Sequence, residues 1–200
     1  MPELSQPGGM GRRLHLGCGR VIKQGWVNHD RLALPGVDVV HDLREFPWPF
    51  ADAEFDEVFM KDVLEHLTDT VRTMDELFRI TRPGATVFLT VPYWNSYAAV
   101  GDPTHVRLFS ETSFDFFDPR NPQCIERSYY SKARFHVEKM GFAITPFEPA
   151  FRLPLLTRDY VIFNPFAKRC VLGLASVFCN VINGLEVWLR RVPDEAGSAA

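Results

Sequence analysis

Short apolar runs that end in glycine, an acid or proline recur along the first half of the chain. Runs of this kind, bounded by turn residues, are typical of buried strands. They predict strands over residues 13–17, 26–30, 37–41, 55–60 and 85–91. Apolar strands that are separated by crossover connections favour a mostly parallel sheet covered on both faces.

One helix is predicted before the fifth of these strands. Apolar residues, Met74 and Leu77 among them, recur at helical spacing over 68–80, and Pro83-Gly84 ends the pattern. Further on, Ser110 is a candidate cap for a short helix that carries Phe114 and Phe117.

Residues 130–140 fit a helix about as well as a strand. We favour a helix because Gly141 then provides its C-cap, before a last strand over 142–147. These elements together predict an α/β fold of the doubly wound, Rossmann-like type.

The stretch from Cys170 to Leu189 is mostly apolar and has basic residues at both ends. It predicts a helix that carries a narrow stripe of small or polar residues. Its length would just span a bilayer, but Asn180, Asn183 and Glu186 make a lipid-facing span costly. Packing on the domain, homodimerisation, contact with a membrane surface and a true span all remain open.

The length of the chain favours a single domain with a tail left over. The 200 residues include 22 basic and 25 acidic ones, and the net charge of −3 disfavours nucleic acid as a partner. The four cysteines lack metal-site spacing and indicate reduced thiols of a cytoplasmic protein, three of them packing and one beside a ligand turn. We divide the chain into a flexible lead-in (1–11), the α/β domain (12–150), a C-terminal helical appendage (151–192) and a flexible tail (193–200).

The first strand ends in Leu16-Gly17-Cys18-Gly19, and the second ends in Asp30. A strand, a glycine turn that lets backbone approach a ligand, and a carboxylate able to accept two ribose hydroxyls together predict a nucleotide site. Asp42, after the third strand, is either a further ligand contact or the start of an Asx-turn.

In this order the motifs resemble the class I S-adenosylmethionine-dependent methyltransferases, specifically a small group found among glycan and secondary-metabolite enzymes. The resemblance covers about residues 12–95 and includes Phe55-Asp56-Glu57-Val58, Val63-Leu64-Glu65-His66-Leu67 and Arg82-Pro83-Gly84-Ala85. It implies S-adenosylmethionine as the cofactor. By position, the cofactor-binding residues would be Gly17, Cys18, Gly19, Asp30, Asp42 and Leu43.

The connection after the glycine turn is shorter than the common family pattern, a feature that the resembling group shares. Ten residues lie between Gly19 and Asp30, which leaves room for a turn and not for a full helix. Without a helix dipole, backbone amides or Arg20 would hold the cofactor carboxylate. The short connection also disfavours a nicotinamide-dependent reductase, because a pyrophosphate needs a helix N-terminus there.

Candidate acceptor-side residues follow the fourth and fifth strands, where ligands of parallel sheets bind. His66 and His105 are the candidate general bases, and His66 also has a structural interpretation as a partly buried histidine. Tyr93, Trp94, Asp102 and Arg107 are candidate substrate contacts. We assign no metal, because Asp102 and His105 alone make an incomplete site.

Two classes of function follow from these features. The first is transfer of a methyl group from S-adenosylmethionine to an oxygen or nitrogen of a small-molecule or glycan-type acceptor. The second is a non-catalytic protein that has a degenerate methyltransferase scaffold and associates with a membrane or a partner. Under both hypotheses we expect a cytoplasmic protein. Its C-terminal helix would contact the inner membrane surface or form a homodimer.

Overall fold

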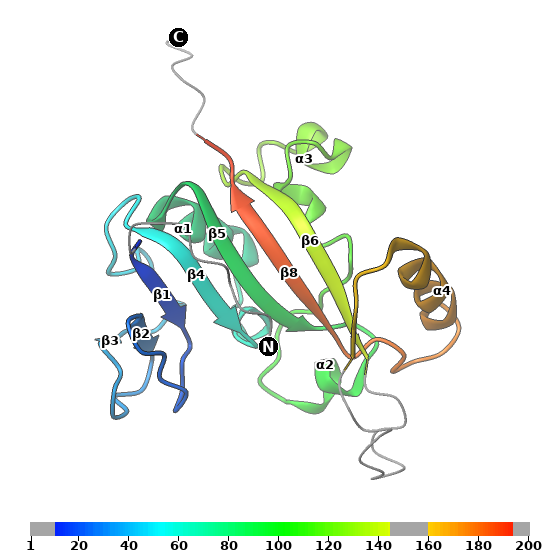
Figure 1. The fold of residues 1–200 in the computed structure, drawn as a ribbon, viewed down its shortest axis with the longest axis horizontal. Helices are drawn as coiled ribbons and strands as arrows, with labels where there is room; N and C mark the ends of the chain where they lie inside the picture. The colour runs from blue at the N-terminus through cyan, green and yellow to red at the C-terminus, as the bar shows by residue number, and fades with distance from the viewer. Residues whose placement is uncertain (1–10, 145–159, 194–200) are drawn as a thin grey trace.

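The computed structural model describes residues 11–144 and 160–193. These residues form one sheet of eight strands in the order β3-β2-β1-β4-β5-β8-β6-β7 (Figure 1). The strands are β1 Arg13–Leu16, β2 Val27–Asp30, β3 Val39–Val40, β4 Phe55–Lys61, β5 Thr81–Pro92, β6 Phe135–Ile144, β7 Tyr160–Ile162 and β8 Gly184–Arg191. The helices are α1 Thr70–Ile80, α2 Tyr97–Gly101, α3 Pro122–Glu126 and α4 Pro165–Ala175, with 3-10 turns η1 Leu64–His66 and η2 Asp115–Phe117.

The sheet is parallel from β3 through β5, and β8 then pairs antiparallel with both β5 and β6. The five strands predicted in the first half of the chain are all present. The predicted α/β, mostly parallel, Rossmann-like fold is therefore confirmed.

The core lies between the sheet and α1. In-register residues Leu14, Val58, Val87 and Leu189 form one row of completely or almost completely buried side chains across four strands. Helix α1 packs Met74, Leu77 and Ile80 onto this face, all at 0% exposure. Each such burial contributes about 1.5–3 kcal/mol. Asp69 caps the helix by accepting from the Arg72 amide at 2.9 Å.

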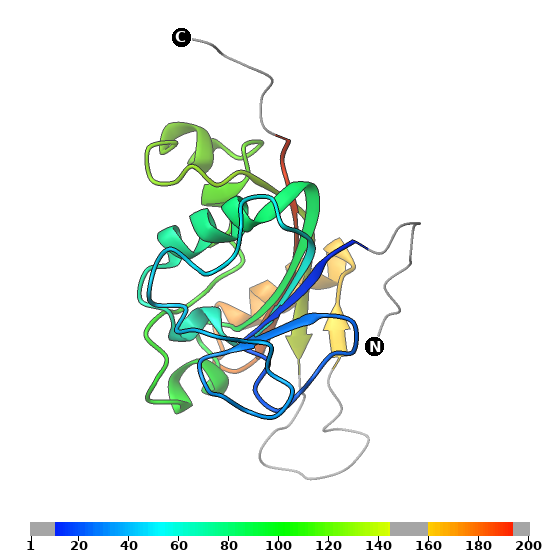
Figure 2. The ribbon, with the colours of Figure 1, turned by 90° about the vertical axis from the view of Figure 1, so that its left-hand side faces the viewer.

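Helices α1, α2 and α3 lie on one side of the sheet (Figure 2), and α4 lies beside the edge next to β6 (Figure 1). In this respect the structure departs from the prediction of a sheet covered on both faces. The connections between β1, β2, β3 and β4 contain no helix, so nothing helical is available to cover the second face. Phe59, Phe88 and Trp188 line up on that face, with ring centroids 5.1 and 4.6 Å apart.

The helix predicted over 130–140 is wrong, because residues 135–144 form strand β6. Phe135 and Phe142 on this strand are fully buried. Gly141 is no helix C-cap but sits mid-strand, where a Cβ would lie 2.5 Å from the side chains of both Val161 and Phe163. Ser110 likewise begins a turn, and Phe114 precedes the 3-10 turn η2.

The helix predicted over 170–189 is also wrong in its second half. Helix α4 ends at Ala175, and residues 184–191 form β8, inserted between β5 and β6. The C-terminal segment is thus part of the sheet and not a helical appendage over 151–192. No helix among the described residues is long and apolar enough to cross a membrane.

The cysteines differ in their exposure. Cys124 is buried, as predicted for a packing thiol, and Cys18 beside the glycine turn is buried too, whereas Cys170 and Cys179 are exposed, against the prediction that they pack. The predicted lead-in and tail lie outside the described residues, apart from one residue each. The predicted boundary near residue 150 lies outside them too.

Candidate active site

The glycine turn after β1 adopts a conformation that requires glycine. Gly17 has a φ of +63°, and a Cβ there would lie 2.3 Å from Cγ2 of Val63. Gly19, at φ +52°, donates its amide to Oδ2 of Asp30 at 2.8 Å. The other oxygen of Asp30 accepts the Leu32 amide at 2.9 Å. The carboxylate at the end of β2 therefore holds the turn at the end of β1, which places both against one space.

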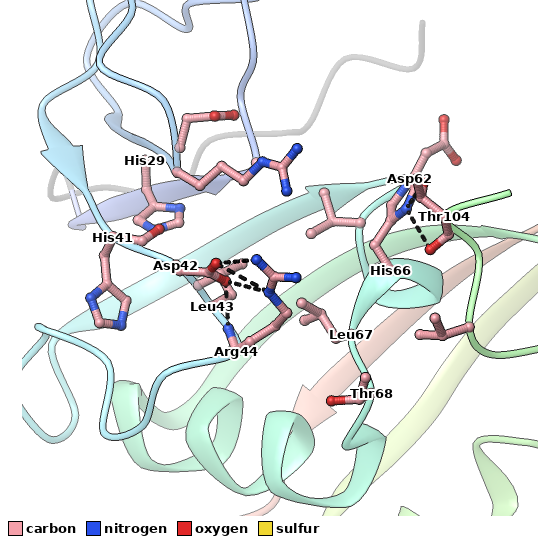
Figure 3. A pocket seen from close by; sticks show the side chains of 15 residues that line it. His29, His41, Asp42, Leu43, Arg44, Asp62, His66, Leu67, Thr68 and Thr104 are labelled. Atoms are coloured by element: carbon pink, nitrogen blue, oxygen red, sulfur yellow. Dashed lines mark hydrogen bonds and ion pairs between the residues drawn. The ribbon is translucent and has the colours of Figure 1, made fainter. Parts of the chain in front are cut away.

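That space is a cavity of about 510 Å³ at the ends of the parallel strands. A volume of this size suits a drug-sized ligand or a nucleotide-like cofactor. Its lining consists of Gly17, His29, Asp30, Arg31, His41, Asp42, Leu43, Arg44, Asp62, Val63, His66, Leu67, Thr68, Thr104 and Val106. Figure 3 shows Asp42 and Arg44 on one side of the cavity and Asp62, His66 and Thr104 on the other.

Asp42 is engaged by its own loop. Its Oδ1 accepts the Arg44 amide at 3.0 Å, and the Arg44 guanidinium grips both carboxylate oxygens (Figure 3). The hydrogen bonds from Arg44 lower the pKa of Asp42 to about 2. Asp42 thus lines the cavity and also forms the Asx-type turn that the sequence left as an alternative.

The opposite side is built from η1 and the loop over 102–107. The amides of Val106 and Arg107 donate to the Glu65 carbonyl at 2.9 and 3.2 Å. Thr104 Oγ1 lies 3.0 Å from Nδ1 of His66, and the Arg107 guanidinium donates to the Thr68 carbonyl at 2.9 Å. Two motifs far apart in the sequence are therefore joined beside the cavity.

The Glu65 side chain lies behind this wall with 1% of its surface exposed. Neither of its carboxylate oxygens has a hydrogen-bond partner in the part of the chain that the structure describes. Burial raises the pKa of Glu65 to about 7. Nε2 of His105 lies 3.9 Å from Oε1, and the His66 and His105 ring centroids are 4.7 Å apart.

The structure brings several predicted site residues to the cavity and leaves others away from its lining. Gly17, Asp30, Asp42, Leu43 and His66 line it, whereas Cys18, Gly19, Tyr93, Trp94, Asp102, His105 and Arg107 do not. Gly19 still contacts Asp30, and His105 lies directly behind His66. The Tyr93 hydroxyl donates to Glu111 at 2.9 Å, and Arg20, the alternative carboxylate ligand, also lies outside the lining.

Some residues that line the cavity are not predicted from the sequence. Arg31 and Arg44 bring two cations to the cavity. Arg31 directly follows Asp30, and Arg44 lies two residues after Asp42. Asp62 comes immediately after β4 with a φ of +52°, and its Oδ1 accepts the Thr90 hydroxyl at 2.6 Å. Its position at the carboxyl end of a parallel strand is the sequence feature that could have identified Asp62 as a site residue.

Comparisons with known proteins agree with the fold and the motifs. A family described as "Methyltransferase domain" matches residues 19–89. A probable S-adenosylmethionine-dependent methyltransferase from Mycolicibacterium smegmatis is 40% identical over 67 residues, which are 33% of this chain. The match spans about a quarter (25%) of the length of that relative.

Two solved structures share the fold at low sequence identity. One is an S-adenosylmethionine-dependent methyltransferase from Thermotoga maritima, described as a possible histamine N-methyltransferase. It has a TM-score of 0.56 and 14% identity, over 95% of this chain and 83% of that one. The other is an S-adenosylmethionine-dependent methyltransferase from Archaeoglobus fulgidus, with a TM-score of 0.55 and 17% identity, over 90% and 86%. Residues 19–89 therefore match a methyltransferase domain, in agreement with the resemblance that the motifs predict, and the two solved structures share the fold.

Proposed function

We propose that this protein transfers a methyl group from S-adenosylmethionine to an oxygen or nitrogen of a small-molecule or glycan-type acceptor. The family match and the cavity at the strand ends support the cofactor. The acceptor class is part of the proposal, as is the predicted cytoplasmic location.

The observation that carries the proposal is the position of Asp30. A carboxylate offers about four acceptor sites, and the Gly19 and Leu32 amides use two of them. The remaining lone pairs border the cavity and fit a vicinal diol such as the cofactor's ribose. Asp42 with Leu43 would then lie beside the adenine, and the glycine turn beside the amino-acid end.

When bound, the cofactor supplies an activated methyl group on a cationic sulfur. The chain's own task is to position the acceptor in line with that methyl and to remove its proton. We assign proton removal to His66 or His105. His66 lines the cavity directly, and Thr104 holds its Nδ1, so its Nε2 is the atom left for the acceptor. Tyr93, Trp94, Asp102 and Arg107 remain proposed acceptor contacts.

Ligand-linked stability tests the cofactor assignment. S-adenosylhomocysteine at about 100 times its Kd should raise the free energy of unfolding by about 2.7 kcal/mol. Asp30→Asn keeps the shape of the side chain but removes the charge and one acceptor, and it should remove most of this gain. Glu126→Gln, on exposed α3, is the matched control and should retain the full gain.

The unfolding curves without ligand show whether Asp30→Asn still folds cooperatively. If that variant unfolds before it can be titrated, direct calorimetry on the wild-type protein decides the matter. No binding of S-adenosylhomocysteine to the wild type at millimolar concentration would contradict the proposal, as would a gain that Asp30→Asn leaves intact.

A second observation supports the predicted membrane contact. Helix α4 and the residues after it expose large apolar side chains, with Phe166 at 77% and Val177 at 74%. Tyr97 and Val100 of α2 are similarly exposed, and the Tyr97 amide binds Oδ1 of Asn180 at 3.0 Å, which ties the two segments together. Large apolar side chains that are exposed on adjoining segments are typical of interaction surfaces. We therefore include contact with a membrane surface through α2 and α4 in the proposal.

Vesicle sedimentation tests this contact. The protein should co-sediment with vesicles of anionic and zwitterionic phospholipid, and Phe166→Asp with Val177→Asp should release it. Ile125→Asp is the control, because Ile125 is also exposed (63%) but lies on α3. Equal release by the control would contradict a specific surface, and concentration-dependent self-association that the α4 variant abolishes would identify a homodimer instead.

A further inference from the structure

Three potential metal ligands meet behind the wall of the cavity. Glu65, His66 and His105 each offer one ligand atom, and these atoms all lie within 4.8 Å of one another. Glu65 and His66 come from η1, and His105 comes from the loop that the Glu65 carbonyl holds in place. The fold therefore joins His105 to Glu65 and His66, whereas the sequence offered only the incomplete pair of Asp102 and His105.

The carboxylate at the centre of this cluster has unused bonding capacity. Glu65 is 1% exposed, and both of its oxygens lack a hydrogen-bond partner among the described residues. A buried polar group that is left unpaired is costly, so native proteins rarely keep one without a ligand or a function.

The hydrogen bonds of His105 leave Nε2 as a free lone pair. Nδ1 of His105 lies 3.1 Å from the Ala99 carbonyl, which can only accept, so Nδ1 carries the proton of the neutral ring. Nε2 then lies 3.9 Å from Oε1 of Glu65 and 3.9 Å from Oδ2 of Asp102. Both distances are too long for a hydrogen bond.

The same reasoning fixes the tautomer of His66. The hydroxyl of Thr104 donates its one proton to Oδ1 of Asp102 at 2.6 Å. It must therefore accept from Nδ1 of His66, which lies 3.0 Å away. Nε2 of His66 is left as a lone pair, so both imidazoles have the protonation that a metal requires.

We propose that Glu65, His66 and His105 bind one divalent first-row transition-metal ion. Two ligands bound to the same zinc ion at about 2.1 Å lie roughly 3–4 Å apart, and the 3.9 Å between Glu65 and His105 falls in this range. Two imidazoles and one carboxylate suit zinc and its neighbours and leave a position open for another ligand.

The open position deepens the proposed function, on which this part of the inference rests. His66 lines the cavity, so an ion at this cluster would stand beside the acceptor. A coordinated acceptor hydroxyl would release its proton to solvent more readily, because a metal ion lowers the pKa of a coordinated oxygen. The histidines would then activate the acceptor through the ion, in place of taking its proton directly, and hydroxyl-bearing acceptors would be favoured.

Calorimetry with zinc chloride tests the site without any assay of activity. The protein carries Cys170→Ser and Cys179→Ser, because these exposed thiols would also bind zinc. After treatment with a chelator, it should bind one zinc ion. Glu65→Gln and His105→Gln should each weaken binding at least about tenfold, since even loss of a supporting partner costs this much. His136→Gln, a partly exposed histidine on β6, is the control and should change nothing.

Two results would overturn the site: no zinc binding by the parent protein, or zinc binding that neither substitution weakens. If His105→Gln does not fold, Glu65→Gln decides. S-adenosylhomocysteine is titrated into Glu65→Gln in parallel. If cofactor binds but zinc binding is absent or unaffected by the substitution, this inference fails while the proposed function stands, whereas absence of cofactor binding by the parent protein contradicts the proposed function.

Discussion

The buried acids on the two sides of the cavity differ in their hydrogen bonding. On the cofactor side, both oxygens of Asp30 accept backbone amides before any ligand arrives. On the acceptor side, neither oxygen of Glu65 has a partner among the described residues. The first wall is pre-organised by its own chain, whereas the second retains bonding capacity for a ligand to satisfy. The cofactor side should therefore be stable without ligand, and the acceptor side should impose a cost.

The largest expected effect comes from the pre-organised wall. Gly17→Ala forces a side chain into a left-handed backbone and against Val63. We expect the free energy of unfolding to fall by about 2–4 kcal/mol, from the backbone penalty and the overpacking together. Urea unfolding measures it, and cofactor binding should be lost as well.

A second substitution separates the two causes. Val63→Ala in the Gly17→Ala protein removes the clash and should restore part of the loss, leaving a backbone penalty of about 1–2 kcal/mol. Gly101→Ala is the control, since a Cβ there meets nothing within 4 Å. A Gly17→Ala protein as stable as the control would contradict the pre-organised turn.

His15 sharpens the comparison, because it is buried like Glu65 but faces away from the cavity, against the Phe59 ring at 5.1 Å. Burial lowers its pKa from 6.5 to about 4. The folded state therefore disfavours the protonated ring, and stability is lost as the pH falls below 6.5. At about pH 5 this shift alone removes roughly 2 kcal/mol relative to neutral pH.

His15→Gln should remove that part of the acid destabilisation. The measurement is the drop in unfolding free energy between neutral pH and about pH 5, compared between wild type and variant. An equal drop in both proteins would show that His15 does not titrate in this way.

The remaining prediction, similar in size to the one for His15, concerns the carboxylate of Glu65, which has no hydrogen-bond partner among the described residues. In the presence of a chelator, Glu65→Met should raise the free energy of unfolding by about 1–3 kcal/mol, because it removes an unpaired buried polar group. Asp30→Asn should have the opposite sign. Chemical unfolding of the two variants checks this contrast, and a destabilised Glu65→Met protein would mean that Glu65 supports the wall in its ligand-free form.

The cofactor half was predictable because its strands and turns are local patterns. Leu16, Gly17 and Asp30 lie within one short stretch, and the chemistry there follows from residue type. β8 was not predictable in this way, because its alternation of Leu185, Val187 and Leu189 is embedded in a longer apolar run. Its partner β5 lies far upstream in the sequence. Pairing with β5 makes this segment a strand although its apolar residues also fit a helix, and that pairing cannot be read from the local sequence.

The acceptor wall was only partly predictable for the same reason. The sequence pointed to His66 and His105 separately, but the chain brings them together through the Glu65 carbonyl, which binds the amides of Val106 and Arg107. In the sequence, Glu65 stands out only as part of the motif Val63-Leu64-Glu65-His66-Leu67. Its burial, which gives it its chemistry, depends on that long-range contact.

The most direct test of the central claim is a crystal structure of the protein with S-adenosylhomocysteine. The account predicts the ribose hydroxyls within hydrogen-bond distance of the Asp30 carboxylate and the sulfur on the side of the cavity where His66 lies. A ligand bound elsewhere, or an adenosine that does not touch Asp30, would contradict it.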